Sequence, residues 1–178
     1  MRESIKINNS GDEQLRVEAL NRYNIFDTPP EQAFDNIAKL GLQLFEVPIC
    51  LITFVDTENV FIKANIGLGE IMGNITKTPK SNSLCALAIK DNSISIFNNN
   101  LIQTDPCVLT SGLFAGETGF KFYAGAPLIT HDGFRIGTIC IVDTAIRDFS
   151  EKNKSVLESL AVIVMSIIEL RQLNTPIN

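Results

Sequence analysis

The pattern of apolar and polar positions is clearest over residues 121–143, where it predicts a β-hairpin. Two runs rich in aromatic and β-branched residues, 121–130 and 134–143, flank the tripeptide His131-Asp132-Gly133. Asp-Gly between such runs favours a tight turn, because glycine accepts the positive φ that the turn requires. Neither run alternates between apolar and polar residues, so both faces of the two strands are expected to be covered. The hairpin is therefore predicted to lie at the centre of a sheet.

Small residues within this hairpin leave space above the strands. They are Ala124, Gly125, Ala126, Gly137 and Thr138. Another stretch of backbone or a ligand could fill that space, and the sequence leaves both alternatives open. The region above the hairpin is therefore the predicted position of any binding site.

Helical periodicity is found on both sides of the strand-forming region. A helix that Asp12 can cap is predicted to end near Asn24, and a second helix is predicted over 31–45. The second helix carries one apolar stripe that should face the core, made of Phe34, Ile37, Leu40 or Gly41, and Leu44. A last helix, capped by Ser150, is predicted to extend to about Leu173.

Shorter apolar runs predict further strands and the loops between them. Strands are expected over 48–56, 60–66 and 93–97, and a short helix is expected over 82–90. Gly, Asn, Thr and Pro are frequent over 67–82, which is typical of a mobile loop that could act as a lid. Residues 98–119 are expected to form a long irregular crossing, and loops of that length are often functional.

The order of these elements predicts an α/β (α+β) fold with a central antiparallel sheet of five or six strands and helices on both faces. At 178 residues the chain is long enough for one well-buried core and too short to favour two. One domain is expected over 12–173, between a disordered N-terminal segment, 1–11, and a C-terminal tail, 174–178.

Composition and charge narrow the classes of function. The net charge is −5 and the basic residues are scattered, which argues against nucleic acid or an anionic membrane as a partner. The N-terminus lacks the apolar stretch of a signal peptide, and the longest uncharged apolar run, 159–168, is too short to span a bilayer, so the chain is interpreted as cytoplasmic. The four cysteines form no Cys-x-x-Cys pair and the chain has a single histidine. Reduced thiols are therefore expected, and neither a metal site nor a cofactor is predicted.

Five ordered motifs resemble those of the GAF family. They are IFDTPPEQAFDNI at 25–37, PICLITFVD at 48–56, SLCALAI at 83–89, KFYAGAPL at 121–128 and GTICIVD at 137–143. The likeness is to the bacterial subgroup found ahead of sensor histidine kinases and diguanylate cyclases, and it extends over about 12–173. It implies a PAS-like sensor fold, usually dimeric, that binds a small ligand or serves as a signalling interface and does no chemistry itself. The implied partners are an unknown small molecule, a second copy of the chain, and a kinase or diguanylate cyclase as output partner.

Two positions depart from the pattern of that family. Leu84 stands where the family often has Phe, and Cys107 stands where it often has arginine. A guanidinium is the natural bidentate partner of an anionic ligand, so its loss weakens any phosphate or carboxylate assignment. The ordered signature of cyclic-nucleotide GAF domains is not found, and no Cys-His pair offers a bilin attachment site.

Eight residues are predicted to line a ligand pocket. They are Phe61, Lys63, Ser83, Cys85, Asp105, Tyr123, Thr138 and Cys140. Lys63 and Asn65 alternate along their strand with Phe61, which places all three on one face, and polar groups on a covered face indicate a pocket. In the alternative, this strand lies at the edge of the sheet and Lys63 reaches solvent.

Other pocket candidates also have a structural alternative. Cys85 and Cys140 could be sensing thiols, although cysteine on an apolar helix or a central strand more often packs as a small hydrophobe. Asp105 could approach a ligand or cap the following turn. Tyr123 could offer its hydroxyl to a ligand or to a loop carbonyl.

An enzyme is the main alternative to ligand binding. Some stand-alone GAF proteins reduce free methionine-R-sulfoxide, which requires thiols that converge on one pocket and form a disulfide. Cys85 and Cys107 lie on segments that could meet, but the motifs match the sensor subgroup, so their Cα atoms are expected to lie beyond disulfide reach, roughly 7 Å. A third alternative is a dimerisation module with a filled core and no ligand.

The last helix is predicted to be the dimer interface, because its apolar residues cover roughly two-thirds of the circumference, against about 100° for a helix that buries one face. The predicted interface residues are Leu157, Leu160, Ile163, Val164, Ile167 and Leu170. On the helical wheel Leu157, Leu160, Val164 and Ile167 form a seam, and Ile163 and Leu170 form a neighbouring stripe together with Val156. The sequence leaves open which of the two packs on the sheet. The other should be left over, and a symmetric pair of helices would bury it.

Overall fold

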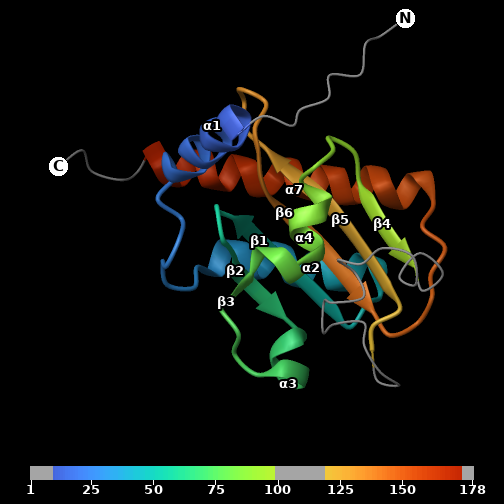
Figure 1. Cartoon of the computed structure of the whole chain (residues 1–178). Helices are drawn as coiled ribbons and strands as arrows, with labels where there is room; N and C mark the ends of the chain where they lie inside the picture. The colour runs from blue at the N-terminus through green and yellow to red at the C-terminus, as the bar shows by residue number, and fades with distance from the viewer. Residues whose placement is uncertain (1–9, 99–118, 174–178) are drawn as a thin grey trace, which may run out of the picture.

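The computed structural model describes residues 10–98 and 119–173, which form a six-stranded antiparallel sheet with helices on both faces (Figure 1). The strands are β1 (Ile49–Val55), β2 (Asn59–Ile66), β3 (Lys77–Pro79), β4 (Ser95–Asn98), β5 (Phe122–Ile129) and β6 (Arg135–Asp143), in the order β3-β2-β1-β6-β5-β4. The helices are α1 (Ser10–Asn21), α2 (Gln32–Phe45), α3 (Leu68–Met72), the 3₁₀ helix η1 (Lys80–Asn82), α4 (Leu84–Ala88) and α7 (Glu151–Leu173). This arrangement confirms the predicted α+β fold.

The predicted hairpin, β5 and β6, lies at the centre of the sheet. β6 pairs with β5 on one side and with β1 on the other. At the turn Gly133 has a φ of +88°, and the amide of Thr130 donates to the carbonyl of Phe134 at 2.9 Å. Both strands are buried along almost their whole length, so both faces are covered as predicted.

The two faces of the sheet are covered by different elements. On one face, called here the helix face, α2 and α7 pack on the central strands and α1 packs against β6. On the opposite face, called here the α4 face, α4 packs against β1, β5 and β6. Figure 1 shows α4 and α7 on opposite sides of the strands. The sheet therefore separates two hydrophobic clusters.

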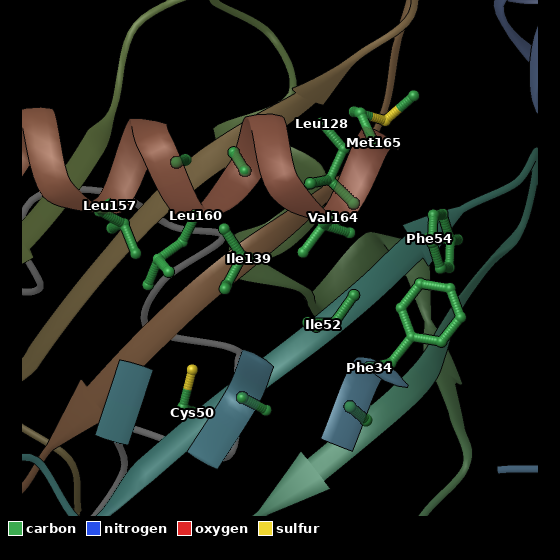
Figure 2. Packing of buried hydrophobic residues seen from close by; sticks show 14 of the residues in the cluster. Phe34, Cys50, Ile52, Phe54, Leu128, Ile139, Leu157, Leu160, Val164 and Met165 are labelled. Atoms are coloured by element: carbon green, nitrogen blue, oxygen red, sulfur yellow. The ribbon is translucent and has the colours of Figure 1, made fainter. Parts of the chain in front are cut away.

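The contacts of α7 decide which of its apolar stripes packs on the sheet. Figure 2 shows Leu157, Leu160 and Val164 within the cluster of the helix face, and all three are buried there. Ile163 is 42% exposed and Leu170 is 60% exposed. A stripe is left over, as expected. The placement of Leu157, Leu160 and Val164 in the dimer interface is corrected, because they belong to the core of their own chain.

The buried stripe of α2 differs from the predicted one. The residues of α2 that face the core are Phe34, Ala38, Gly41 and Phe45. Leu44 is 52% exposed, so its assignment to the stripe is wrong, and of the two alternatives Leu40 and Gly41 the structure selects Gly41. A Cβ at Gly41 would lie 2.8 Å from Cys50 Sγ. The missing side chain is what lets α2 approach β1 closely.

Segment 67–82 is more ordered than its composition predicts. It forms α3, β3 and η1, and β3 pairs with β2. Leu68 is buried. The expectation of a free loop is therefore wrong, because a three-residue strand and a single turn of helix are too short to produce a periodic pattern.

Helix boundaries agree with the sequence to within a few residues. α1 begins at Ser10, before the predicted cap Asp12. Its Arg16 is buried and donates to the carbonyl of Val55 at 2.6 Å, which fixes the helix to the end of β1. Ser150 accepts a hydrogen bond from the amide of Asn153 at 3.2 Å and caps α7 as predicted.

Residues 1–9, 99–118 and 174–178 lie outside the described part of the chain. Most of the predicted N-terminal segment, the irregular crossing and the C-terminal tail fall in these ranges. So do Asp105 and Cys107. The role of Asp105 and the distance between Cys85 and Cys107 therefore stay predictions.

Candidate functional site

The sheet divides the predicted pocket in two. Phe61 belongs to the hydrophobic cluster of the helix face, and Lys63 lies on that same face, over the ring of Phe34. The α4 face carries five of the predicted pocket residues: Ser83, Cys85, Tyr123, Thr138 and Cys140. The predicted residues therefore do not line one cavity, and each face has to be considered by itself.

A β-bulge in β2 places Lys63 on the helix face. The register between β1 and β2 shifts by one residue, and Lys63 is the residue of β2 that has no partner on β1. Such a bulge interrupts the alternation of side chains along the strand. Phe61 and Lys63 share a face as predicted, but Ala64 also joins the helix-face cluster. The alternation that would put Asn65 with Lys63 therefore fails at the bulge.

Lys63 is fully bonded inside the protein. Its Nζ donates to Thr28 Oγ1 at 2.6 Å, to the carbonyl of Pro29 at 2.6 Å and to Glu31 Oε1 at 2.7 Å. Burial lowers the pKa of Lys63, and the carboxylate of Glu31 opposes that shift. Because β3 covers the edge of β2 and the side chain of Lys63 is buried, the alternative in which Lys63 reaches solvent is wrong.

Glu31 links Lys63 to the end of α7. Arg171 Nε donates to Glu31 Oε1 at 3.0 Å, and Arg171 Nη1 donates to the carbonyl of Tyr23 at 2.9 Å. Burial raises the pKa of Glu31, but its hydrogen bonds and charge interactions with Lys63 and Arg171 outweigh burial and lower it overall. This group joins β2, the segment before α2 and the last turn of α7. It is a structural joint rather than an open binding site.

Five polar side chains meet at the centre of the α4 face. Cys85 Sγ lies 3.9 Å from Cys140 Sγ, and the Tyr123 hydroxyl donates to Cys85 Sγ over 3.6 Å. Thr53 and Thr138 stand directly opposite each other on β1 and β6, and their hydroxyls lie 2.9 Å apart in a hydrogen bond. All five side chains are buried. They are called here the thiol–hydroxyl cluster.

Two glycines of the central hairpin make this cluster possible. A Cβ at Gly125 would lie 2.4 Å from the hydroxyl oxygen of Tyr123, so the tyrosine side chain occupies the space that the glycine leaves. A Cβ at Gly137 would lie 2.0 Å from the carbonyl oxygen of Thr53 on the neighbouring strand. At both positions the space expected from the sequence is filled by the protein itself rather than left for a ligand.

The cluster shifts the pKa values of its own groups. Hydrogen bonds from Cys140 and from the three hydroxyls lower the pKa of Cys85, although burial acts in the opposite direction. The pKa of Cys140 is raised by its hydrogen bond to Cys85 and by burial, and that of Tyr123 is raised mainly by burial. Cys50, in apolar surroundings on the helix face, has its pKa raised to about 12 by burial alone. Of the three cysteines in the described residues, only Cys85 has its pKa lowered.

An open groove of about 510 Å³ runs beside α4. Its lining residues are Thr57, Glu58, Lys80, Ser81, Ser83, Ala86, Leu87 and Lys90. Ser83 also accepts a hydrogen bond from the amide of Cys85 at 3.2 Å, which caps α4. The groove therefore borders the helix that carries Cys85.

Two searches of residues 10–98 and 119–173 give negative results. No group of three or more His, Cys, Asp or Glu side chains in these ranges is placed to hold a metal ion. In the same ranges, no helix combines the length and the apolar character needed to cross a membrane.

Comparison with known proteins identifies the family. The family model of the GAF domain matches residues 29–168. The chain belongs to the GAF family. A cyclic di-GMP phosphodiesterase of Pseudomonas aeruginosa is 31% identical over 165 residues, which are 92% of this chain and 27% of that protein. This GAF chain therefore spans about a quarter of the length of that curated relative.

Solved structures share the fold of this GAF domain. The GAF domain of an Acinetobacter phosphoenolpyruvate-protein phosphotransferase superposes with a TM-score of 0.65 at 18% identity, covering 94% of this chain and 96% of that one. The free methionine-R-sulfoxide reductase of Neisseria meningitidis has a TM-score of 0.62 at 17% identity, covering 98% and 100%. At these identities the likeness is one of fold.

Sequence reasoning does not single out Thr53, Glu31 or Arg171. Thr53 is the only polar residue within the strand Ile49–Val55, and that interruption of a buried apolar run is the signal that could have found it. Glu31 and Arg171 are 140 positions apart, so no local pattern connects them. Only the packing of α7 beside α2 brings the two together.

Proposed function

We propose that this GAF domain is a non-catalytic sensory domain that binds a small molecule on the α4 face of its sheet. The observation that carries the proposal is the thiol–hydroxyl cluster, five buried polar side chains within an apolar face. Ligand sites typically combine apolar walls with a few convergent polar groups of this kind. The groove beside α4 borders the helix that carries Cys85, one member of the cluster.

The chemistry of the cluster favours a neutral ligand. Its polar groups are hydroxyls and thiols, and it contains no lysine or arginine. Lys63 lies on the opposite face, where Thr28, Pro29 and Glu31 already bond it. A small molecule with hydroxyl or carbonyl groups matches these donors and acceptors better than a phosphate does.

We further propose that the sheet relays ligand binding to α7. β6 contributes Thr138 and Cys140 to the α4 face, and the alternate residues Ile139 and Ile141 to the helix-face cluster that α7 covers. A displacement of β6 by a ligand would therefore change the packing of α7. Arg171 ties the last turn of that helix to Glu31, which gives the relay a second anchor.

A second copy of the chain is the proposed partner of α7. Ile163 and Leu170 are exposed on one side of α7. Val156 and Ile167, which are partly buried, extend the same apolar stripe. Soluble proteins seldom leave such stripes open unless they bind a partner.

In light scattering at tens of micromolar, Ile163→Glu should convert a dimer into a monomer. Val162→Glu is the matched control, because Val162 is 66% exposed about a quarter-turn away from the stripe. A monomeric wild type, or equal effects of the two variants, would exclude this interface.

The output of the signal is proposed from the curated relative. Because that relative is a cyclic di-GMP phosphodiesterase, a domain that makes or degrades cyclic di-GMP is the output partner that we favour over a histidine kinase. The fold likeness to the methionine sulfoxide reductase does not carry its activity to this chain, because at 17% identity the likeness is one of fold alone.

The ligand proposal is tested by a thermal-shift screen of neutral metabolites against the full chain. Binding should raise the melting temperature, and Thr138→Val, which keeps shape but removes a cluster hydroxyl, should reduce the shift. Thr130→Val is the matched control, because Thr130 is equally buried on the same hairpin but bonds Asp132 at the turn. Ligands that stabilise wild type and Thr138→Val to the same extent would show that the cluster is not their site.

A further inference from the structure

We infer that Cys85 and Cys140 are a redox-active dithiol, which a peroxide converts into a disulfide that joins α4 to β6. This inference goes beyond the proposed ligand sensing, which requires only the polar groups of the cluster and no reaction. It concerns a pair of thiols different from Cys85 and Cys107, whose Cα atoms are expected to lie beyond disulfide reach. It rests on three observations: the distance between the sulfurs, the hydroxyls around them and the unequal exposure of the two thiols.

The two sulfurs are already in contact. They lie 3.9 Å apart, on elements separated by 55 positions in the sequence. A disulfide requires about 2.0 Å, so the sulfurs have to approach by about 2 Å. β6 is a central strand held on both sides, whereas α4 is a helix of only five residues between its caps at Ser83 and Ile89. A shift of α4 toward the sheet supplies the approach.

The surroundings of Cys85 stabilise its reactive form. The Tyr123 hydroxyl and the thiol of Cys140 point at its sulfur, and Thr53 and Thr138 add two more hydroxyls. Hydrogen bonds of this kind favour the thiolate, which is the nucleophile in thiol oxidation. The lowered pKa of Cys85 agrees with this arrangement.

Cys50 shows what a structural cysteine looks like in the same molecule. It is buried on the helix face between α2 and the sheet, as Figure 2 shows, beside the space that Gly41 leaves. Burial alone raises its pKa to about 12. The interpretation of cysteine as a small hydrophobe therefore fits Cys50, and the hydroxyls around Cys85 have no counterpart there among the described residues.

The exposure of the two thiols sets the order of the reaction. Cys85 is 7% exposed on a helix that borders the groove, whereas Cys140 is fully buried. The Cys85 thiolate attacks hydrogen peroxide, so the O–O bond breaks and an S–O bond forms, giving a sulfenic acid and hydroxide. The Cys140 thiol then displaces the hydroxyl group, and an S–S bond replaces the S–O bond. Overall, two thiols and one peroxide give one disulfide and two waters.

The test is peptide mapping of the full chain after oxidation. The reduced protein is treated with hydrogen peroxide, its remaining thiols are blocked with N-ethylmaleimide, and it is digested without reduction for mass spectrometry. We expect a Cys85–Cys140 cross-linked peptide lighter by two hydrogen atoms, which Cys50→Ser retains. In Cys140→Ser, Cys85 should accumulate as a sulfenic acid that dimedone traps. A Cys85–Cys107 cross-link in its place, or no cross-link in folded wild-type protein, would overturn the inference.

A pair of tyrosine variants tests the role of the hydroxyls. Tyr123→Phe removes one donor to Cys85 Sγ, and we expect disulfide formation about tenfold slower at neutral pH, as for the loss of one hydrogen bond to a charged group. Tyr23→Phe is the control, because Tyr23 is similarly buried but lies on the helix face. An unchanged rate in Tyr123→Phe, or equal slowing in both variants, would show that the cluster does not activate Cys85.

Discussion

The two faces of the sheet differ both in the size of their hydrophobic clusters, which is larger on the helix face, and in what lies at their centres. On the helix face, apolar residues from α2 and α7 close over the strands, and Cys50 is packed among them. On the α4 face, a short helix covers a cluster of thiols and hydroxyls. The long helices supply packing area, whereas the five residues of α4 leave room for an adjoining groove. Under the proposed function, the helix face supplies most of the stability and the α4 face carries the sensing site.

This difference follows from where the polar groups find their partners. On the helix face, Lys63 and Glu31 are bonded across elements and form a permanent joint. On the α4 face, the hydroxyls of Thr53 and Thr138 bond mainly each other and the sulfur of Cys85. Polar side chains that hydrogen-bond mainly one another can replace those hydrogen bonds with hydrogen bonds to a ligand. They can also give them up when two of the side chains form a covalent bond.

The largest expected effect is a loss of stability on the helix face. Leu157 is fully buried there, and Leu157→Ala should lower the free energy of unfolding by about 2–5 kcal/mol, because the cavity beneath α7 cannot collapse completely. Tyr123→Phe on the α4 face should lower it by only about 0.5–1.5 kcal/mol. Urea titrations of both variants measure the difference. Equal losses would contradict the division between a stability face and a functional face.

A smaller effect is expected at the joint between Lys63 and Glu31. Glu31→Gln leaves the buried ammonium of Lys63 without its carboxylate and should lower the free energy of unfolding by about 1–3 kcal/mol. Glu151→Gln is the control, since Glu151 pairs with Lys154 at an exposed site on the first turn of α7 and should cost less than about 1 kcal/mol. If the two variants lost the same stability, the joint would be no more than a surface ion pair.

The smallest effect is a change in the dependence of stability on pH. Hydrogen bonding to Arg16 lowers the pKa of Glu13 from 4.5 to about 2, against the effect of burial and with help from Lys80. Because the folded state holds this proton less tightly than the unfolded state does, the stability that Glu13 contributes is complete above pH 4.5 and is lost as the pH falls toward 2. Glu13→Gln should therefore flatten the acid limb of a plot of unfolding free energy against pH. An unchanged slope would show that the pairing does not persist in solution.

Most of the fold could be predicted because its signals are local. The Asp-Gly turn, the long apolar strands and the cap at Ser150 are each read from a few neighbouring residues, and β5, β6 and α7 appear where they were expected. The predictions that the structure contradicts also have local causes. β3 and η1 are too short to show a period, and the bulge at Lys63 breaks an alternation that the sequence gives no reason to doubt.

The candidate site was harder to predict, because it depends on the pairing between strands. The structure brings Cys85, Tyr123, Thr138 and Cys140 together, and their role in a ligand pocket stays a prediction. Thr53 joins them only through the register of β1 with β6, which sequence patterns do not specify. Phe61 and Lys63 lie on the opposite face from the predicted pocket, because alternation along one strand does not reveal which face carries α4.

The most direct test of the difference between the two faces is the reactivity of their cysteines toward iodoacetamide. Folded, reduced protein would be labelled over a range of pH, and mass spectrometry would follow Cys85 and Cys50 in the same sample. Cys85 should react first, with a midpoint well below the ordinary thiol pKa of 9.0, because hydrogen bonds from Cys140 and the cluster hydroxyls lower its pKa. Cys50 should stay unlabelled until denaturant unfolds the domain, because burial raises its pKa to about 12. Labelling of both cysteines at the same rate, or of neither before unfolding, would contradict the account.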